Sequence, residues 1–160
     1  MTTSPLAISP PAAASAMSAH AVFGRRVIGA VVALCAAALL TVAAWLEPSP
    51  TGLGTHQQLH MPQCGWIIMF DTPCPTCGMT TAFAHAADGH LWASFRAQPL
   101  GCLLAVTSAM ALLLGSYVAA TGSRVAGGLA PLWRPRMGWV IAAMVLLAWG
   151  YKVLSHKGVL

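Results

Sequence analysis

Charged side chains are scarce in this sequence. Only 7% of its 160 residues are charged, and only three residues are acidic. Soluble domains carry roughly a quarter charged residues, so this composition excludes an ordinary soluble domain. Hydrophobic residues make up 58% of the chain instead. The sequence therefore predicts an integral membrane protein, with the lipid bilayer as its first partner.

The sequence also lacks the common signatures of catalysis and of nucleic-acid binding. It contains no pair of neighbouring carboxylates, no phosphate-binding loop, no Ser-His-Asp order and no metalloprotease motif. The formal net charge of +5 is spread over separate segments and forms no basic stripe with interleaved aromatic residues. These absences argue against a nucleic-acid partner and favour a protein that is not an enzyme.

Three long apolar stretches define the expected architecture. They lie at residues 27–46, 100–120 and 139–154. A helix needs about 20 apolar residues to cross the roughly 30 Å hydrocarbon core of a bilayer. We therefore predict an all-α integral membrane protein with about three transmembrane helices. A cleaved signal peptide is the alternative for the first stretch, with a cleavage site at residues 42–44, but its apolar core would be too long.

The stretches between the spans indicate the domain organisation. Residues 1–24 are rich in Ala, Ser and Pro, and we expect a disordered tail there. Residues 25–158 then form a single membrane domain. The long first loop, residues 47–98, is too long to lack structure of its own, so we expect one or two short helices in it. Its apolar run at residues 66–70 fits either a strand or a segment that dips into the membrane interface.

Basic residues predict how the chain crosses the membrane, because positive charge near the ends of spans tends to stay cytoplasmic. Arg25 and Arg26 precede the first span, whereas all three acidic residues lie in the first loop. We therefore expect a protein of the cell (inner) membrane with a cytoplasmic N-terminus and the cysteine-containing loop outside. In this orientation Lys152 and Lys157 also lie outside, against the general trend.

Cysteines in the first loop carry the candidate chemistry. Cys74 and Cys77 are separated by two residues, and Cys64 lies upstream of them. Two thiols at this spacing can chelate one metal ion or close a disulfide. Structural zinc sites have four Cys or His ligands. We therefore predict a zinc site formed by Cys64, Cys74, Cys77 and His60, with His56 as the alternative fourth ligand.

The residues from Pro75 onward fit a helix, because proline suits the first helical position and apolar residues follow at helical spacing. Cys74 would then lie at the start of a helix, where backbone N–H groups favour the thiolate, so we expect it to be the more reactive thiol. His85 would rise about 12 Å above Cys77 on that helix. It cannot share a metal ion with Cys77, since zinc bonds measure about 2.0–2.3 Å.

One string in the loop is unusual: residues 74–80 read Cys-Pro-Thr-Cys-Gly-Met-Thr. With the upstream Cys64 and the downstream Gln98-Pro99, this string resembles an uncharacterised bacterial membrane-protein family, the domain of unknown function numbered 2752. The resemblance covers residues 56–101. Many members carry Arg after the last Thr of the string, whereas this chain has Thr81. The resemblance implies a small integral membrane protein with this motif near the membrane, and it implies no activity.

Two functional hypotheses follow. The leading one is a non-enzymatic membrane protein whose first loop is held by a zinc site and binds or assembles with another membrane protein. The rival is a membrane thiol-disulfide oxidoreductase in which Cys74 attacks, Cys77 resolves and Cys64 relays. An outside loop would favour the rival, because cysteine pairs are usually oxidised there. A transport or channel subunit fits less well, because the central parts of the spans carry no charged residues.

Overall fold

The computed structural model describes residues 12–125 and 135–157, and this part of the chain is helical with no strand. The three long helices are α1 (Ala12–Trp45), α5 (Pro99–Thr121) and α6 (Pro135–His156). Each contains a stretch that is long and apolar enough to cross a membrane: Ala19–Trp45, Pro99–Thr121 and Met137–His156. The predicted all-α membrane architecture with about three spans is confirmed.

The first helix begins earlier than the sequence suggested. Residues 1–11 of the expected disordered tail lie outside the described residues, but α1 starts at Ala12. The part of the tail at residues 12–24 is therefore helical, and the prediction differs from the structure there. The physical reason is that alanine is the strongest helix former, so this alanine-rich segment extends the helix of the first span by several turns.

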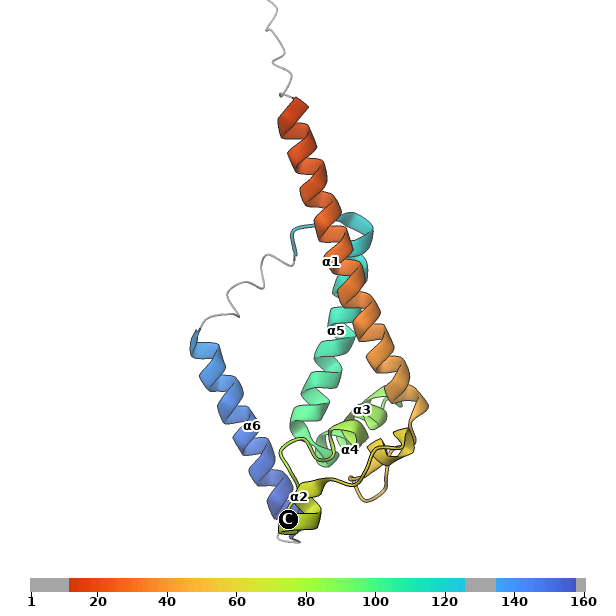
Figure 1. Ribbon diagram of the computed structural model, residues 1–160, viewed down its shortest axis with the longest axis vertical. Helices are drawn as coiled ribbons and strands as arrows, with labels where there is room; N and C mark the ends of the chain where they lie inside the picture. The colour runs from red at the N-terminus through yellow and green to blue at the C-terminus, as the bar shows by residue number, and fades with distance from the viewer. Residues whose placement is uncertain (1–11, 126–134, 158–160) are drawn as a thin grey trace, which may run out of the picture.

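Helices α1 and α5 pack against each other along much of their length (Figure 1). Glycines allow the close approach. A Cβ atom added to Gly29 would lie 2.8 Å from the carbonyl oxygen of Gly115 and 2.8 Å from the backbone nitrogen of Ala119. Small residues at such crossings let two backbones gain van der Waals contact, which stabilises helix pairs inside a bilayer.

The first loop folds into four short helical segments, more than the one or two that we expected. They are the 3-10 helix η1 (Thr55–Leu59) and the α-helices α2 (Gly65–Phe70), α3 (Met79–Ala87) and α4 (Leu91–Ala97). The run at residues 66–70 is thus helical and not a strand. Helices α3 and α4 lie across the loop end of the α1–α5 pair (Figure 1).

A small core joins this loop to the spans. Ala43 of α1, Phe83 of α3 and Ala105 of α5 are buried together, and Met79 and Ala86 pack against them. The loop is therefore fixed to the membrane helices by apolar contacts at the end of the α1–α5 pair. This arrangement places the cysteines at the same end.

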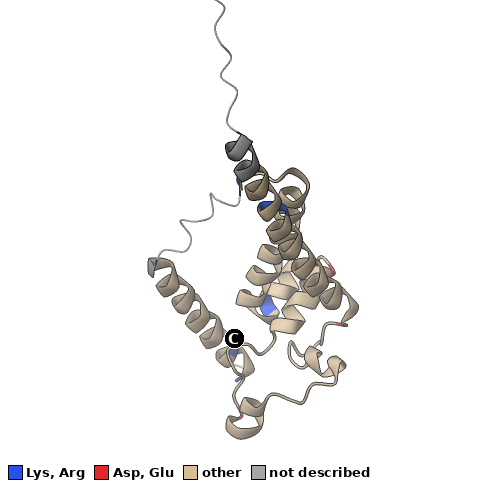
Figure 2. Ribbon diagram, turned by 45° about the horizontal axis from the view of Figure 1, so that its top comes forward, with Lys and Arg blue, Asp and Glu red and all other residues tan. Residues whose placement is uncertain are grey.

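Helix α6 is attached differently. It stands apart from α1 and α5 where it begins and approaches the loop where it ends (Figures 1 and 2). Near its end, the side chains of Trp149, Tyr151 and Lys152 donate hydrogen bonds to carbonyl oxygens of the loop. Polar contacts with the loop, rather than an extended helix–helix interface, fix the end of α6.

The close approach of α1 and α5 leads to a test with an internal control. Gly29→Ala places a methyl group 2.8 Å from backbone atoms of α5 and should destabilise the fold by about 1–3 kcal/mol through overpacking. Gly24 lies in the same helix and has nothing within 4 Å of an added Cβ. Gly24→Ala should therefore be neutral or stabilising. Thermal unfolding in one detergent compares the two variants, and equal melting temperatures would contradict the packing that we describe.

Candidate metal centre

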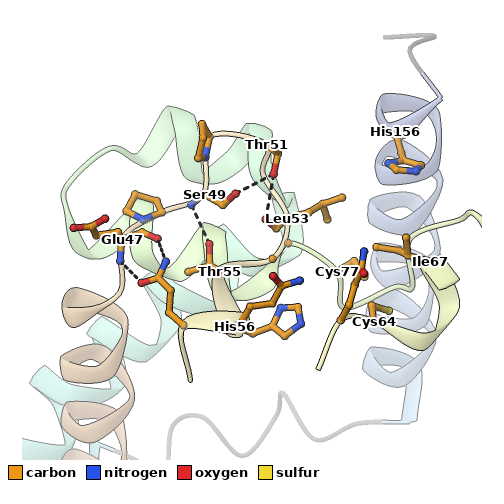
Figure 3. A pocket seen from close by; sticks show the side chains of 17 residues that line it. Glu47, Ser49, Thr51, Leu53, Thr55, His56, Cys64, Ile67, Cys77 and His156 are labelled. Carbon is orange, nitrogen blue, oxygen red and sulfur yellow. Dashed lines mark hydrogen bonds between the residues drawn. The ribbon is translucent and has the colours of Figure 1, made fainter. Parts of the chain in front are cut away.

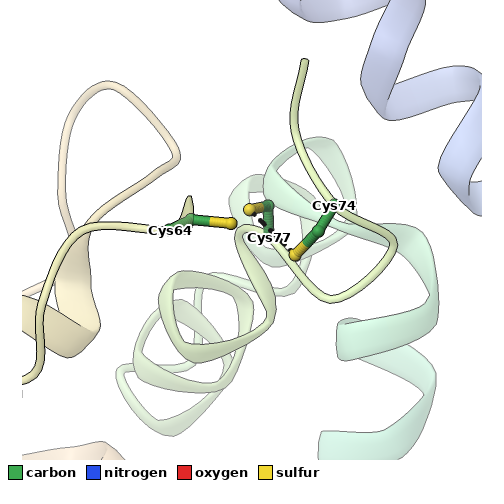
Figure 4. A group of neighbouring side chains, drawn as sticks. All are labelled: Cys64, Cys74 and Cys77. Carbon is green, nitrogen blue, oxygen red and sulfur yellow. Dashed lines mark hydrogen bonds between the residues drawn. The ribbon is translucent and has the colours of Figure 1, made fainter. Parts of the chain in front are cut away.

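Three cysteines of the loop come together in space. The sulfur atoms of Cys64, Cys74 and Cys77 all lie within 4.8 Å of one another. Cys64 is the residue before the first turn of α2, whereas Cys74 and Cys77 belong to the turn that precedes α3. Figure 4 shows the Cys64 side chain approaching the other two from a separate stretch of the chain. This convergence matches the three cysteines of the predicted site.

The Cys74–Cys77 segment is a turn and not the start of a helix. The backbone N–H of Cys77 donates to the carbonyl of Cys74 at 3.0 Å, and α3 begins only at Met79. Our prediction of a helix from Pro75 is therefore wrong, and so is the position of Cys74 at a helix start. Proline suits the second position of a turn as well as a first helical position, so the sequence allowed both.

Gly78 explains why the helix starts late. Its φ of 86° lies in the left-handed region, where residues with a Cβ are strained. A Cβ at this position would also lie 2.8 Å from the carbonyl oxygen of Gly52. The turn that carries Cys77 therefore approaches the segment around Gly52 closely, and only glycine allows that approach.

Side-chain donors from distant helices hold this turn. The amide of Gln98, at the junction of α4 and α5, donates to the carbonyl of Pro75 at 3.0 Å. The indole of Trp149 in α6 donates to the carbonyl of Pro73 at 3.0 Å. The two acceptor carbonyls belong to the residues on either side of Cys74, so these hydrogen bonds fix the backbone from which its side chain projects. Sequence reasoning did not identify this role for either residue.

The two ends of the cluster differ in their electrostatics. Burial disfavours the thiolate of Cys64. Hydrogen bonds to its sulfur, first from the Cys77 thiol and then from the backbone N–H groups of Ile67 and Trp66, outweigh that effect and lower its pKa to about 7. Burial raises the pKa of Cys77 to about 12, and hydrogen bonds with Cys74 and Cys64 add to the shift. The cluster thus presents one ready thiolate and one strongly protonated thiol.

Two clefts meet at the cysteines. One has a volume of about 720 Å³ and is lined by polar side chains of the segment that follows α1, together with His156 (Figure 3). The other, also about 720 Å³, is mainly apolar and reaches Leu39 of α1 and Leu104 of α5. Cys64, Cys77 and His56 border both clefts. The cluster is therefore reached from a polar side and from a side that opens toward the spans.

The predicted histidine ligand lies outside the cysteine group. Among the described residues, the group whose ligand atoms meet within 4.8 Å consists of the three cysteines alone. His60 is exposed, with a φ of 58° at the end of η1. His56 is half-buried and its ring nitrogen contacts the carbonyl of Pro62 at 3.2 Å. Of the two histidines, His56 is the one that borders the same clefts as Cys64 and Cys77.

Two buried threonines form a hydrogen bond beside the cysteine turn. The hydroxyls of Thr55 in η1 and Thr81 in α3 share a hydrogen bond of 2.8 Å, and both residues are buried. The same Thr55 hydroxyl accepts a hydrogen bond from the backbone N–H of Ser49. Thr81 therefore joins α3 to the segment that follows α1.

The pKa difference predicts how the thiols react in reduced, metal-free protein. The thiolate is the nucleophile, and a thiol with a pKa of about 7 is half ionised at pH 7. Alkylation of Cys64 by N-ethylmaleimide should therefore accelerate as pH rises through 7 and then level off. Cys77, with a pKa of about 12, should remain slow up to pH 9. Pulsed alkylation with peptide mass spectrometry measures both, and equal rates would contradict this description.

Comparison with known proteins supports the resemblance. Residues 64–112 match the model of a family described as Protein of unknown function (DUF2752), which confirms the family that the cysteine motif resembled. The match includes all three cysteines of the cluster and continues into α5. No curated protein and no solved structure matches the chain.

Proposed function

We propose that this protein is a non-enzymatic membrane protein whose first loop is held by a structural zinc ion and serves as a partner-binding or assembly module. The observation that carries the proposal is the convergence of Cys64, Cys74 and Cys77 within 4.8 Å. Thiolates are the ligands that zinc prefers in structural sites. Three thiols from two separate segments fit a metal site better than a simple dithiol pair does.

The sulfur geometry supports a shared metal ion. Sulfurs bound to one tetrahedral zinc at about 2.3 Å lie roughly 3.8 Å apart. Cys74 Sγ and Cys77 Sγ are 3.1 Å apart, and no separation within the group exceeds 4.8 Å. The backbone N–H groups that point at Cys64 Sγ favour its thiolate, and a bound metal ion would displace the proton of Cys77.

A histidine would complete the coordination. His60 is the fourth ligand that we proposed from the sequence, and it lies in the loop between η1 and Cys64. His56 is the alternative, and its place on both clefts beside Cys64 and Cys77 supports it. Comparing His60→Ala with His56→Ala for zinc affinity distinguishes the two assignments.

The charge distribution supports a loop outside the cell (inner) membrane. The guanidinium of Arg25 donates to the carbonyl of Gly122 at 2.8 Å, so the start of the first span and the end of α5 lie together. The cysteine loop is at the opposite end of this helix pair (Figure 1). With the arginine end in the cytoplasm, the cysteine loop would face outward.

An exposed apolar helix next to Cys64 supports partner binding. Ile68, Met69 and Phe70 of α2 are 68%, 75% and 62% exposed. No residue of this helix is buried. Cys64 immediately precedes α2, so a metal ion at the cluster would fix the position of these side chains. We propose that another membrane protein covers them.

Metal content is the first test. Gently purified native protein should hold about one zinc ion per chain, and the Cys74→Ser, Cys77→Ser double variant should hold none. Cys35→Ser is the matched control, because Cys35 lies in the first span far along the chain from the cluster, and it should retain the metal. Inductively coupled plasma mass spectrometry gives the stoichiometry.

The same experiment addresses the rival function. Metal-free native protein with a Cys74–Cys77 disulfide would favour a thiol-disulfide oxidoreductase, which the 3.1 Å separation of these sulfurs also permits. In that reaction the two thiols lose two electrons and two protons while a disulfide of a partner is reduced to two thiols. This outcome would sink the zinc proposal.

Photocrosslinking tests the proposed partner surface. Met69→p-benzoylphenylalanine puts a crosslinker on the exposed face of α2, and illumination of native membranes should yield a discrete adduct with one membrane protein. The adduct should disappear when Cys74→Ser and Cys77→Ser are added, because α2 would lose its fixed position. Lipid adducts alone would show that α2 lies in the membrane interface and binds no protein.

A further inference from the structure

Lys152 is a buried lysine at the end of the last span. Its side chain is only 6% exposed, although it lies one turn before the end of α6. Its ammonium donates to the carbonyl of Ala97 at 2.8 Å and to the carbonyl of Gly52 at 3.2 Å. The lysine therefore joins the last span to two segments of the first loop, one near its beginning and one near its end.

This placement differs from that of an ordinary lysine at a helix end. Such a lysine usually extends its side chain so that the ammonium reaches water at the membrane surface. A buried ammonium loses its hydration and needs compensating negative charge. In the described structure the hydrogen bonds of Lys152 go to carbonyl oxygens and to no carboxylate. Carbonyl dipoles satisfy two of its three N–H donors but leave its charge unbalanced.

The cysteine turn is the neighbouring group that can supply the missing charge. A Cβ atom built on Gly78 would lie 3.0 Å from Lys152 Nζ, so the ammonium sits against the residue next to Cys77. Once a bound metal ion has displaced the proton of Cys77, the negative charge on its sulfur and the nearby ammonium attract each other. A zinc ion bound by three thiolates and a neutral histidine carries one net negative charge. The ammonium is the matching positive charge.

We propose that Lys152 is the charge partner of the thiolate metal centre, so that metal binding in the loop and docking of α6 strengthen each other. This inference rests on the proposed zinc site and adds to it a positioning residue from a different span. Coupling between two binding events is reciprocal. Metal in the site should hold Lys152 in place, and the Lys152 charge should tighten metal binding.

Chemical labelling of the native chain tests the first direction. Lys152 and Lys157 are its only lysines, and Lys157 is exposed. With zinc bound, a small amine-acetylating reagent should modify Lys157 and spare Lys152. After treatment with a chelator, modification of Lys152 should increase while that of Lys157 stays the same. Equal protection of Lys152 with and without zinc would overturn the coupling, and this measurement requires no variant.

Substitution tests the second direction. Lys152→Met keeps much of the side-chain volume and removes the charge, and it should weaken zinc binding roughly 10- to 100-fold in competition with a chelator. Lys157→Met, the matched control, should leave the affinity unchanged. Lys152→Gln retains a hydrogen-bond donor without the charge, so it should also bind weakly. Recovery of full affinity in Lys152→Gln would reduce Lys152 to a hydrogen-bond donor and overturn the charge role.

Replacing zinc with cobalt shows whether Lys152 acts on the metal centre through its charge or only through its packing. A positive charge beside a thiolate lowers the energy of its electrons, so the sulfur-to-cobalt charge-transfer band of Lys152→Met should move to longer wavelength. The band of Lys157→Met should not move. Native protein that holds no zinc would sink the proposed function as a whole. Native protein that holds zinc as tightly as Lys152→Met does would sink only the role of Lys152.

Discussion

Peptide carbonyl groups near a membrane need hydrogen-bond donors, and the first loop obtains several of them from side chains far away in the sequence. Trp149 and Lys152 of α6 and Gln98 at the start of α5 all donate to loop carbonyls. The bonds from Trp149 and Lys152 fix the position of the C-terminal end of α6 relative to the other spans. The bonds from Trp149 and Gln98 also fix the backbone around Cys74, so the geometry of the cysteine cluster depends on them.

The cluster combines two opposite local environments. Backbone N–H groups stabilise the thiolate of Cys64 from one side, while burial keeps Cys77 protonated on the other. Such asymmetry suits a site that assembles around a metal ion, because one ligand is ready and the others become thiolates as the ion binds. The clefts on both sides leave the cluster accessible from the polar loop and from the apolar end of the spans.

Hydropathy and cysteine spacing carried most of what the sequence could predict. The three spans follow from long apolar runs, and the meeting of Cys64 with Cys74 and Cys77 follows from a loop that can fold back. The late start of α3 could not be predicted from the sequence, because Pro75 fits both a turn and a helix. Only the close contact between Gly78 and Gly52 decides between them.

The role of Lys152 was beyond sequence reasoning for a different reason. Its bond to Gly52 spans 100 residues, and no local pattern indicates such a pairing. A lysine near the end of an apolar helix is normally read as a topology signal. What distinguishes it is its burial, which exists only once the loop has folded around it.

The dependence of the loop on α6 also has a consequence for biosynthesis. The cysteines leave the ribosome well before Trp149 and Lys152, so the loop lacks two of its side-chain donors until the last span has been made, and one of them, Trp149, is a donor to the cysteine turn. During that interval the backbone around Cys74 lacks the hydrogen bond from Trp149. The last helix therefore supplies the final hydrogen bonds of the loop. A chain truncated before α6 would carry its cysteines in a loop that lacks them.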